Sequence, residues 1–331
     1  MFSAEQYRAL HDGAGLVFRV DRGLLRLTGA DRLAFLQGIL TNDVAGLQSG
    51  EGRYAALLTA NGRMIADMRV VELGDATLLD VATFHARSLR DRFDLSVFTE
   101  DVLISDETDA FHQIGIHGPH AVDAIVQSLN LPGHADALNF LPVDGHRRLD
   151  GVIAICSEDF GVTGFDLIVP VGESDALTGA FLNSGVVVVA PDTADVARIE
   201  AGQPKFGVDM DVDTIPLEAG IEGRAISLTK GCYVGQEIII RMLHRGQGRV
   251  AKRLVGLTFD PAATVPFKGD AIKAGDRQVG AVTSSTQSPA LGRPIAMGYV
   301  HRDFAEPGHM VIVTTAGREQ PAAVSALPFR G

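Results

Sequence analysis

Hydrophobic and polar residues alternate along much of the first 110 positions with the two-residue period of β-strands. Asp21-Arg22-Gly23 separates the first two of four such runs and predicts a hairpin between them. Asn61-Gly62 separates the other two, and this pair is the strongest short hairpin signal because both turn positions favour positive φ. The four runs cover residues 16–20, 24–28, 54–59 and 64–73.

Helical periodicity marks two further stretches of the same segment. Apolar residues recur at helical spacing after Asp31, a residue type that favours the N-cap position. A strand at 78–82 precedes a second helix at 84–94, in which Leu89 and Phe93 are expected to face the core.

A second unit of strands and helices begins near Phe111. Its predicted strands cover residues 111–116, 152–156, 165–171 and 186–190. Its predicted helices cover residues 119–129, 174–183 and 192–201, the first of them opened by Pro119. Strands outnumber helices and hairpins mix with crossovers, which favours antiparallel α+β layers over a doubly wound parallel sheet.

From about Gly248 the pattern changes to short strands at regular spacing, punctuated by Gly and Pro. These strands cover residues 250–259, 270–272, 278–285, 295–300 and 310–314. This arrangement, without a helical stretch of useful length, is typical of a small closed barrel. We therefore predict an α+β protein with two mixed antiparallel-sheet and helix domains, at 1–110 and 111–247, followed by a C-terminal β-barrel at 248–331.

Composition excludes several classes of partner. The chain has 331 residues, of which 46% are hydrophobic and 21% charged, so it is long and apolar enough to bury a sizeable core. Its formal net charge of −12 offers no global attraction to nucleic acid or to an anionic membrane. Apolar runs also stay far below the roughly 20 residues of a membrane span. We expect neither nucleic acid nor membrane as a partner.

Only two cysteines occur, Cys156 and Cys232. They are too few for a disulfide framework, and too few for a self-contained iron–sulfur or structural zinc site, so no bound metal is expected. The N-terminal residues lack the apolar core of a signal peptide. Together these features favour a cytoplasmic protein.

The densest chemistry lies at residues 230–237, which read Lys-Gly-Cys-Tyr-Val-Gly-Gln-Glu and precede the apolar triplet 238–240. The plain interpretation is a helix entry, in which glycines turn the chain and polar residues face water. The alternative is a reactive site. Cys232 would lie beside a helix N-terminus and two residues from Lys230, an environment that favours the thiolate.

This octapeptide resembles the signature of the YgfZ-type folate-binding proteins, relatives of the glycine-cleavage T-protein, an aminomethyltransferase. Further matching stretches follow in the same order along the chain, at residues 35–38, 40–43, 116–121, 198–202, 206–209 and 215–218. The resemblance implies three small domains in a ring around a central pocket that holds tetrahydrofolate. It also implies a role in making or repairing iron–sulfur clusters, with iron–sulfur client or assembly proteins as partners.

Glu200, on the predicted helix 192–201, matches the pterin-reading glutamate of that family. A pterin presents two adjacent donors, which a carboxylate accepts in bidentate fashion. The alternative is an exposed helical carboxylate, the usual situation of a glutamate. The resemblance thus implies a cofactor between the first two domains, with Glu200 at its pterin end.

Other residues of the matched motifs are expected around the cofactor, namely Lys230, Tyr233, Gln236 and Asn42. Cys232 is the candidate reactive thiol. Arg241 and Arg245 would suit the anionic glutamate tail of folate, or else belong to a solvated face beside a loop. Asn42 and Asp43 are equally compatible with a helix-ending turn.

Three remaining residues favour structural interpretations. His117 and His120 flank Gly118-Pro119 and lack a third metal ligand in the sequence, so a turn is expected there. Cys156 lies in an apolar run and is expected to be a core thiol.

The stretch 81–88 bears on whether the chain is an enzyme. The T-protein resemblance implies a motif Asn-Ala-x-Asn-x-x-x-Asp there, whose aspartate activates the folate or orients the aminomethyl group. This chain has Val81 and Ser88 at the two ends, and neither the asparagines nor the aspartate is present. We therefore expect a tetrahydrofolate-binding accessory protein without classical turnover. The alternatives are a T-protein-like aminomethyltransferase, or a scaffold for a cluster-assembly partner with a vestigial folate pocket.

Overall fold

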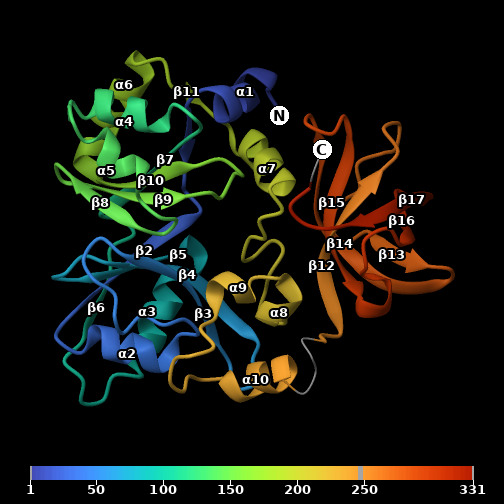
Figure 1. Ribbon diagram of the computed structural model, residues 1–331, viewed down its shortest axis with the longest axis horizontal. Helices are drawn as coiled ribbons and strands as arrows, with labels where there is room; N and C mark the ends of the chain where they lie inside the picture. Colours follow the sequence, from blue (N-terminus) through green and yellow to red (C-terminus); the bar gives the residue numbers. More distant parts are fainter. Residues whose placement is uncertain (1, 245–248, 330–331) are drawn as a thin grey trace.

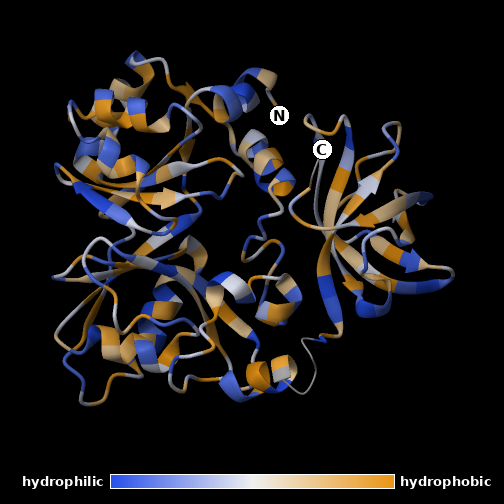
Figure 2. Cartoon of the chain, viewed as in Figure 1, coloured by the Kyte–Doolittle hydropathy of each residue, from blue (hydrophilic) through white to orange (hydrophobic). Residues whose placement is uncertain are grey.

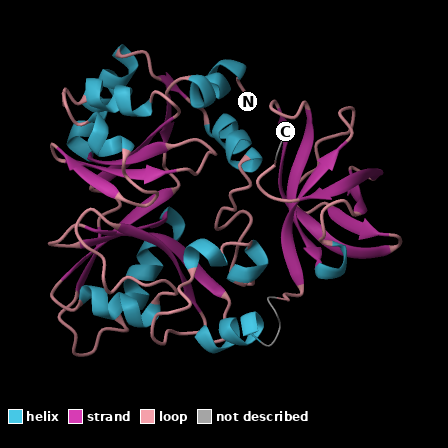
Figure 3. Ribbon diagram, in the orientation of Figure 1, coloured by secondary structure: helices cyan, strands magenta, loops and turns pink. Residues whose placement is uncertain are grey.

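The computed structural model describes residues 2–244 and 249–329, which form three bodies around a common centre (Figure 1). Two mixed bodies of helix and sheet lie on one side, and a closed six-stranded barrel lies on the other (Figure 3). The predicted class, α+β with two mixed domains and a C-terminal barrel, is confirmed. Within the described residues, no helix has both the length and the apolar character needed to cross a membrane.

The first body is built on a five-stranded antiparallel sheet in the order β3-β4-β5-β2-β6. Its strands are β2 (Arg22–Thr28), β3 (Gly52–Leu58), β4 (Met64–Glu72), β5 (Thr77–Ala82) and β6 (Leu103–Asp106). Its helical elements are α2 (Arg32–Ile39), the 3-10 turn η1 (Thr83–His85) and α3 (Ala86–Asp94). Leu89 and Phe93 of α3 are buried in the core against this sheet, as the periodicity predicts. The hairpin prediction at Asn61-Gly62 is confirmed, because β3 and β4 pair on either side of it.

The second body carries a six-stranded sheet in the order β11-β1-β7-β10-β9-β8. Its strands are β1 (Gly15–Phe18), β7 (Phe111–His117), β8 (His146–Leu149), β9 (Val152–Ser157), β10 (Gly164–Pro170) and β11 (Val187–Val188). The helices packed on its outer face are α4 (Ala121–Ser128), α5 (Ala135–Asn139) and α6 (Val171–Asn183). The two sheets face each other, with helices on the outside of each (Figure 1).

The hairpin predicted at Asp21-Arg22-Gly23 is wrong. β1 pairs with β7 and β11 in the second sheet, whereas β2 pairs with β5 and β6 in the first. Leu16 is buried in the second core and Leu25 in the first, so the turn signal marks a crossing between two bodies. The sheets therefore do not follow the predicted boundary at residue 110, because the first 20 residues belong with the second body.

The described residues of the segment 206–250 also depart from the predicted domain division, because many of their apolar side chains pack on the first body. Phe206, Leu217, Tyr233 and Ile239 share a core with Tyr54 and other residues of the β3–β4 hairpin. The helices of this segment are α8 (Pro216–Ala219), α9 (Glu222–Ala225) and α10 (Gln236–His244). Hydrophobic and hydrophilic residues alternate around α10, as expected for a helix with one buried face (Figure 2).

The barrel closes in the order β12-β15-β14-β13-β16-β17. Its strands are β12 (Lys252–Phe259), β13 (Ala271–Ala274), β14 (Arg277–Ser288), β15 (Arg293–His301), β16 (Met310–Thr315) and β17 (Arg318–Ser325). The strand β17 is not among the predicted strands, because charged residues and Pro321 obscure its alternation. This strand pairs with both β12 and β16, so it completes the closure.

Two helices lie between the second body and the barrel, α1 (Ala4–Asp12) and α7 (Pro191–Glu200) (Figure 1). Leu10 of α1 shares a small core with Ala194 and Ala197 of α7. On its other side α7 places Ile199 against Ile295 and Met297 of the barrel. The helix α7 therefore joins the second body to the barrel.

Candidate functional site

Lys230, the first residue of the octapeptide 230–237, is buried and holds the end of α2. Its Nζ donates to the backbone carbonyls of Gln37 at 2.6 Å, Leu40 at 2.5 Å and Asn42 at 3.1 Å. Carbonyls at a helix C-terminus otherwise lack partners. An ammonium has three donors, and all three are engaged here, so Lys230 has no donor left for a cofactor.

Asn42 and Tyr233 belong to the same contact between octapeptide and sheet. The Asn42 amide donates to the carbonyls of Tyr54 and Arg224, both at 2.8 Å, and its Oδ1 accepts from the amide of Asp43 at 2.9 Å. The Tyr233 ring is buried, 5.1 Å from Lys230 Nζ, and burial raises the pKa of its hydroxyl to about 12. The expected cofactor contacts of both residues are thus replaced by contacts within the protein.

The other motif residues lie nearer the surface. Cys232 is exposed and precedes the first residue of α10, Gln236, by four positions, so it does not lie beside a helix N-terminus as predicted. The Gln236 side-chain amide donates to the carbonyl of Gly231, at 3.5 Å. Arg241 pairs with Glu237 at 2.6 Å on the exposed side of α10. The predicted tail contact Arg245 lies outside the described residues.

Glu200 ends α7 and joins three parts of the chain. Its Oε2 accepts from the Tyr7 hydroxyl of α1 at 2.6 Å. Its Oε1 accepts from the Ser288 hydroxyl and from the Ala290 amide, both in the barrel. Burial and the Glu200 carboxylate together raise the pKa of Tyr7. Glu200 is therefore not the freely exposed carboxylate of the alternative interpretation.

These residues do not converge on one site. Glu200 ends α7, beside the barrel and α1, whereas the octapeptide leads into α10 at the lower edge of the view, with α8 and α9 between the two helices (Figure 1). The structure brings together Lys230, Asn42 and Tyr233, and it leaves Glu200 apart.

Ion pairs fill part of the space between the two facing sheets. Arg69 of β4 contacts Asp80 of β5 at 2.5 Å and Asp166 of β10 at 2.6 Å. Arg19 contacts Asp166 at 2.9 Å, and Arg22 contacts Asp80 at 2.8 Å. Burial alone would raise the pKa of both carboxyls, but the arginines outweigh it and hold each pKa below its usual range. Protein side chains thus fill part of the space between the first two domains in which the sequence places the cofactor.

His117 lies in the same layer and is fully buried rather than part of a turn. Its Nε2 is 3.4 Å from Asp166 Oδ1, and its ring meets Phe160 edge-on at 4.7 Å. Gly164 makes room for it, since a Cβ there would lie 2.3 Å from His117 Nδ1, and Gly115 does the same on the other side. His117 is therefore a core histidine whose Nε2 faces Asp166, while its buried Nδ1 has no hydrogen-bond partner among the described residues.

At the edge of this layer lies a group that we call the central cluster, made of Tyr54, Asp67, Phe84, His85 and Phe206. Asp67 is 7% exposed; its Oδ2 accepts from the Tyr54 hydroxyl at 2.8 Å, while its buried Oδ1 has no hydrogen-bond partner. Phe84 is 65% exposed, and its ring centre lies 4.5 Å from that of His85 and 6.5 Å from that of Phe206. The cluster therefore combines an open aromatic face with an unsatisfied carboxylate oxygen.

Ser88 follows this cluster on α3, at the end of the stretch in which the resemblance places an aspartate. Its hydroxyl donates to the carbonyl of His85 at 2.9 Å. A hydroxyl bonded in this way neither carries charge nor accepts a proton at neutral pH. The sequence alone shows that this position lacks an acidic group. The structure adds that the Ser88 hydroxyl is bonded to a backbone carbonyl.

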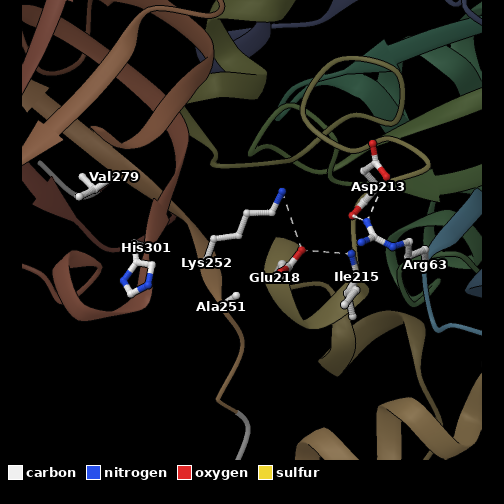
Figure 4. Close-up of a pocket in the computed structure, with 8 residues that line it drawn as sticks. All are labelled: Arg63, Asp213, Ile215, Glu218, Ala251, Lys252, Val279 and His301. Atoms are coloured by element: carbon white, nitrogen blue, oxygen red, sulfur yellow. Dashed lines mark hydrogen bonds and ion pairs between the residues drawn. The ribbon is translucent and has the colours of Figure 1, made fainter. Parts of the chain in front are cut away.

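A pocket of about 340 Å³ lies elsewhere, between the first body and the barrel (Figure 4). Arg63 and Asp213 form an ion pair at one end, at 3.1 Å. Lys252 of β12 extends toward the Glu218 carboxylate, 4.0 Å away, with His301 on the barrel side (Figure 4). Glu218 also accepts from the amide of Ile215 at 3.4 Å, which caps α8. The charged groups of this pocket are largely paired with each other.

The fold and these contacts define a three-domain protein of the aminomethyltransferase architecture. Residues 2–230 match the family described as GCVT N-terminal domain, and residues 252–330 match the one described as glycine cleavage T-protein C-terminal barrel domain. The chain therefore belongs to the glycine cleavage T-protein family.

Its relatives agree with this assignment. Proteins of Streptomyces avermitilis and Streptomyces coelicolor, both named aminomethyltransferase, are each 30% identical over 341 residues, covering 98% of this chain and 88% of theirs. The crystal structure of glycine cleavage system aminomethyltransferase T from Bartonella henselae superposes with a TM-score of 0.88 at 24% identity, covering 98% of this chain and 89% of that one. The latter match shows the shared fold.

Sequence reasoning misses Asp67 and its neighbour Arg69, although a signal for them exists. Both are charged residues two positions apart within the mostly apolar strand β4, so they share one face of the sheet. A charged pair at that spacing in a buried strand indicates an internal polar site. The hairpin prediction for this segment rests on the alternation of apolar and polar residues and on the Asn61-Gly62 turn, so it does not single out these two charged residues.

Proposed function

We propose that this protein binds tetrahydrofolate and serves the assembly or repair of iron–sulfur clusters in client proteins, without catalysing aminomethyl transfer. The observation that carries the proposal is Ser88, which stands where the T-protein motif has its aspartate and whose hydroxyl is bound to a backbone carbonyl. A positioned acid–base group typically contributes 10²- to 10⁴-fold in rate. The octapeptide resemblance supports the YgfZ-type role, and two unpaired cysteines suit a reducing compartment such as the cytoplasm.

The residues present fit a reduced pterin. Glu200 has lone pairs for about four donors and accepts three, so a pterin edge would compete with the Tyr7 hydroxyl for Oε2. The exposed Phe84 ring offers a stacking face, and Asp67 Oδ1 offers a free acceptor. Bound tetrahydrofolate would supply nitrogens that carry one-carbon units.

Aminomethyl transfer is the second candidate function, and the names of the relatives favour it. They are called aminomethyltransferase and align over nearly the whole chain. The unpartnered Asp67 carboxyl also gives the chain an acidic group in the central cluster that the Ser88 position lacks.

Two measurements separate these functions. Calorimetric titration of the purified protein with tetrahydrofolate should show binding, and Glu200→Ala should weaken it roughly 30- to 150-fold, the loss of a charged acceptor for two donors. Mixed with the other components of the glycine cleavage system, the protein should form no methylene-tetrahydrofolate. Absence of folate binding would overturn the proposal, and turnover near that of an authentic T-protein would favour the second candidate.

A further inference from the structure

One carboxyl group of the first sheet differs from its charged neighbours. Asp80 on β5 and Asp166 on β10 each contact two arginines. Asp67 on β4 makes no ion pair among the described residues, and only one of its oxygens accepts a hydrogen bond, from Tyr54 at 2.8 Å. The other, Oδ1, is buried and unpartnered. Such a group is costly in a folded protein, because the carboxylate loses water without gaining a full set of donors.

The electrostatic surroundings of Asp67 carry this cost. Burial raises the pKa of Asp67, and the nearby charge of Arg22 only partly opposes this effect. A carboxyl with a raised pKa is less stable as an anion in the folded protein than in the unfolded chain. A group retained at the expense of stability, whose charge reaches the histidine that adjoins an open aromatic ring, points to a ligand.

The surroundings of Asp67 define the chemistry of that ligand. The Asp67 carboxylate acts on His85, since it opposes the lowering of the His85 pKa by burial. His85 adjoins the 65% exposed ring of Phe84, which Gly207 holds in place, because a Cβ on Gly207 would lie 2.8 Å from that ring. An acceptor beside an exposed aromatic face suits a flat heterocycle that bears an N–H donor.

We propose that Asp67 is a pterin-binding residue, whose Oδ1 accepts a hydrogen bond from a ring N–H of a reduced pterin stacked on Phe84. This inference rests on the proposed binding of tetrahydrofolate and assigns it a contact. It makes Asp67 a ligand-binding residue, distinct from the structural ion pairs around it.

The test compares Asp67→Asn with a matched control on the same strand, Glu72→Gln. Glu72 is also buried, but its oxygens are engaged by Arg32, Thr77 and the amide of Gly74. Calorimetric titration with tetrahydrofolate should show about 10- to 100-fold weaker binding for Asp67→Asn. Its melting temperature should stay equal or rise, because a strained charge is removed. Glu72→Gln should melt lower and bind as the parent does.

The pH dependence of the affinity for tetrahydrofolate provides a second measurement, which a purely structural role of Asp67 would not change. Parent affinity should fall as Asp67 takes up a proton on acidification, and Asp67→Asn should lack that dependence. Phe84→Ala should also weaken binding, and it is independent of the core because Phe84 is exposed. If Asp67→Asn does not fold, Phe84→Ala and the parent pH profile decide.

The outcomes distinguish a failure of the proposed tetrahydrofolate binding from a failure of the contact assigned to Asp67. If the parent does not bind tetrahydrofolate, the proposed function fails. If the parent binds and both Asp67→Asn and Phe84→Ala bind equally well, the assignment of Asp67 is overturned and a water molecule is the partner of Oδ1.

Discussion

At the scale of single residues, hydrogen-bonding capacity decides which motif side chains remain available to a ligand. Lys230 and Asn42 direct all their donors to backbone carbonyls. Glu200 keeps acceptor capacity, and Asp67 keeps a whole oxygen. A sequence motif names residue types, but whether a donor meets ligand or backbone depends on contacts made far along the chain. This is why the sequence could propose Lys230 and Asn42 as cofactor contacts but could not exclude them.

The two cysteines should differ in reactivity. Cys232 is exposed, whereas Cys156 is buried on β9 and burial raises its pKa to about 11. Iodoacetamide at neutral pH should therefore modify one thiol in the native protein and two after unfolding, counted by intact mass. Cys232→Ser should show none in the native protein and keep the parent melting temperature. Native labelling at Cys156, or at neither site, would contradict this assignment.

At the scale of elements, the octapeptide 230–237 packs on the β3–β4 hairpin, and its two glycines have different surroundings. Gly235 has a φ of +85°, and a Cβ there would lie 2.5 Å from the carbonyl oxygen of Thr59 in the β3–β4 hairpin. Gly231 has open space around it. The apolar pattern could predict that hairpin, because its information is local. The octapeptide's partner could not be predicted, because it lies about 170 positions earlier.

Substitution of these two glycines tests the docking. Gly235→Ala should lower the free energy of unfolding by about 2 kcal/mol or more, since it adds backbone strain and a clash with a main-chain atom. Gly231→Ala is the matched control and should change it by less than about 0.5 kcal/mol. Urea denaturation of the three proteins measures both values. Equal midpoints for the two variants would show that Gly235 is not held against the hairpin.

At the scale of the whole molecule, the contact between the two mixed bodies combines an apolar cluster with paired charges and depends on pH. His146 of β8 is 2% exposed, and its amide donates to the carbonyl of Gly50 in the first body at 2.9 Å. The sequence predicts the three bodies from the hydrophobic periodicity of their strands and helices. It does not predict which faces meet, because nothing local to β4 and β5 shows that a second sheet covers their charged residues.

Acid should weaken this contact through His146. Burial, with Arg148 nearby, lowers the pKa of His146 to about 4, so between pH 6.5 and pH 4 the unfolded chain binds a proton that the folded protein does not. The free energy of unfolding should therefore fall as pH drops through that window, by about 1–2 kcal/mol from this residue after solvent screening. His146→Gln should lose correspondingly less stability between pH 7 and pH 4.5 in thermal or urea unfolding. Identical slopes for the two proteins would exclude His146 as the titrating group.

The crossing between β1 and β2 has a consequence for synthesis on the ribosome. Gly15 of β1 pairs with His117 of β7 and with Val187 of β11, so the first strand of the second sheet emerges before either of its partners. At about 5–20 residues per second, the roughly 100 residues between β1 and β7 take roughly 5–20 s to make. During that interval β2 to β6 can already form their own sheet, while the apolar residues of β1 remain uncovered. The nascent chain thus exposes an unpaired strand at its leading end, which makes this segment the natural point for a chaperone to act or for aggregation to begin.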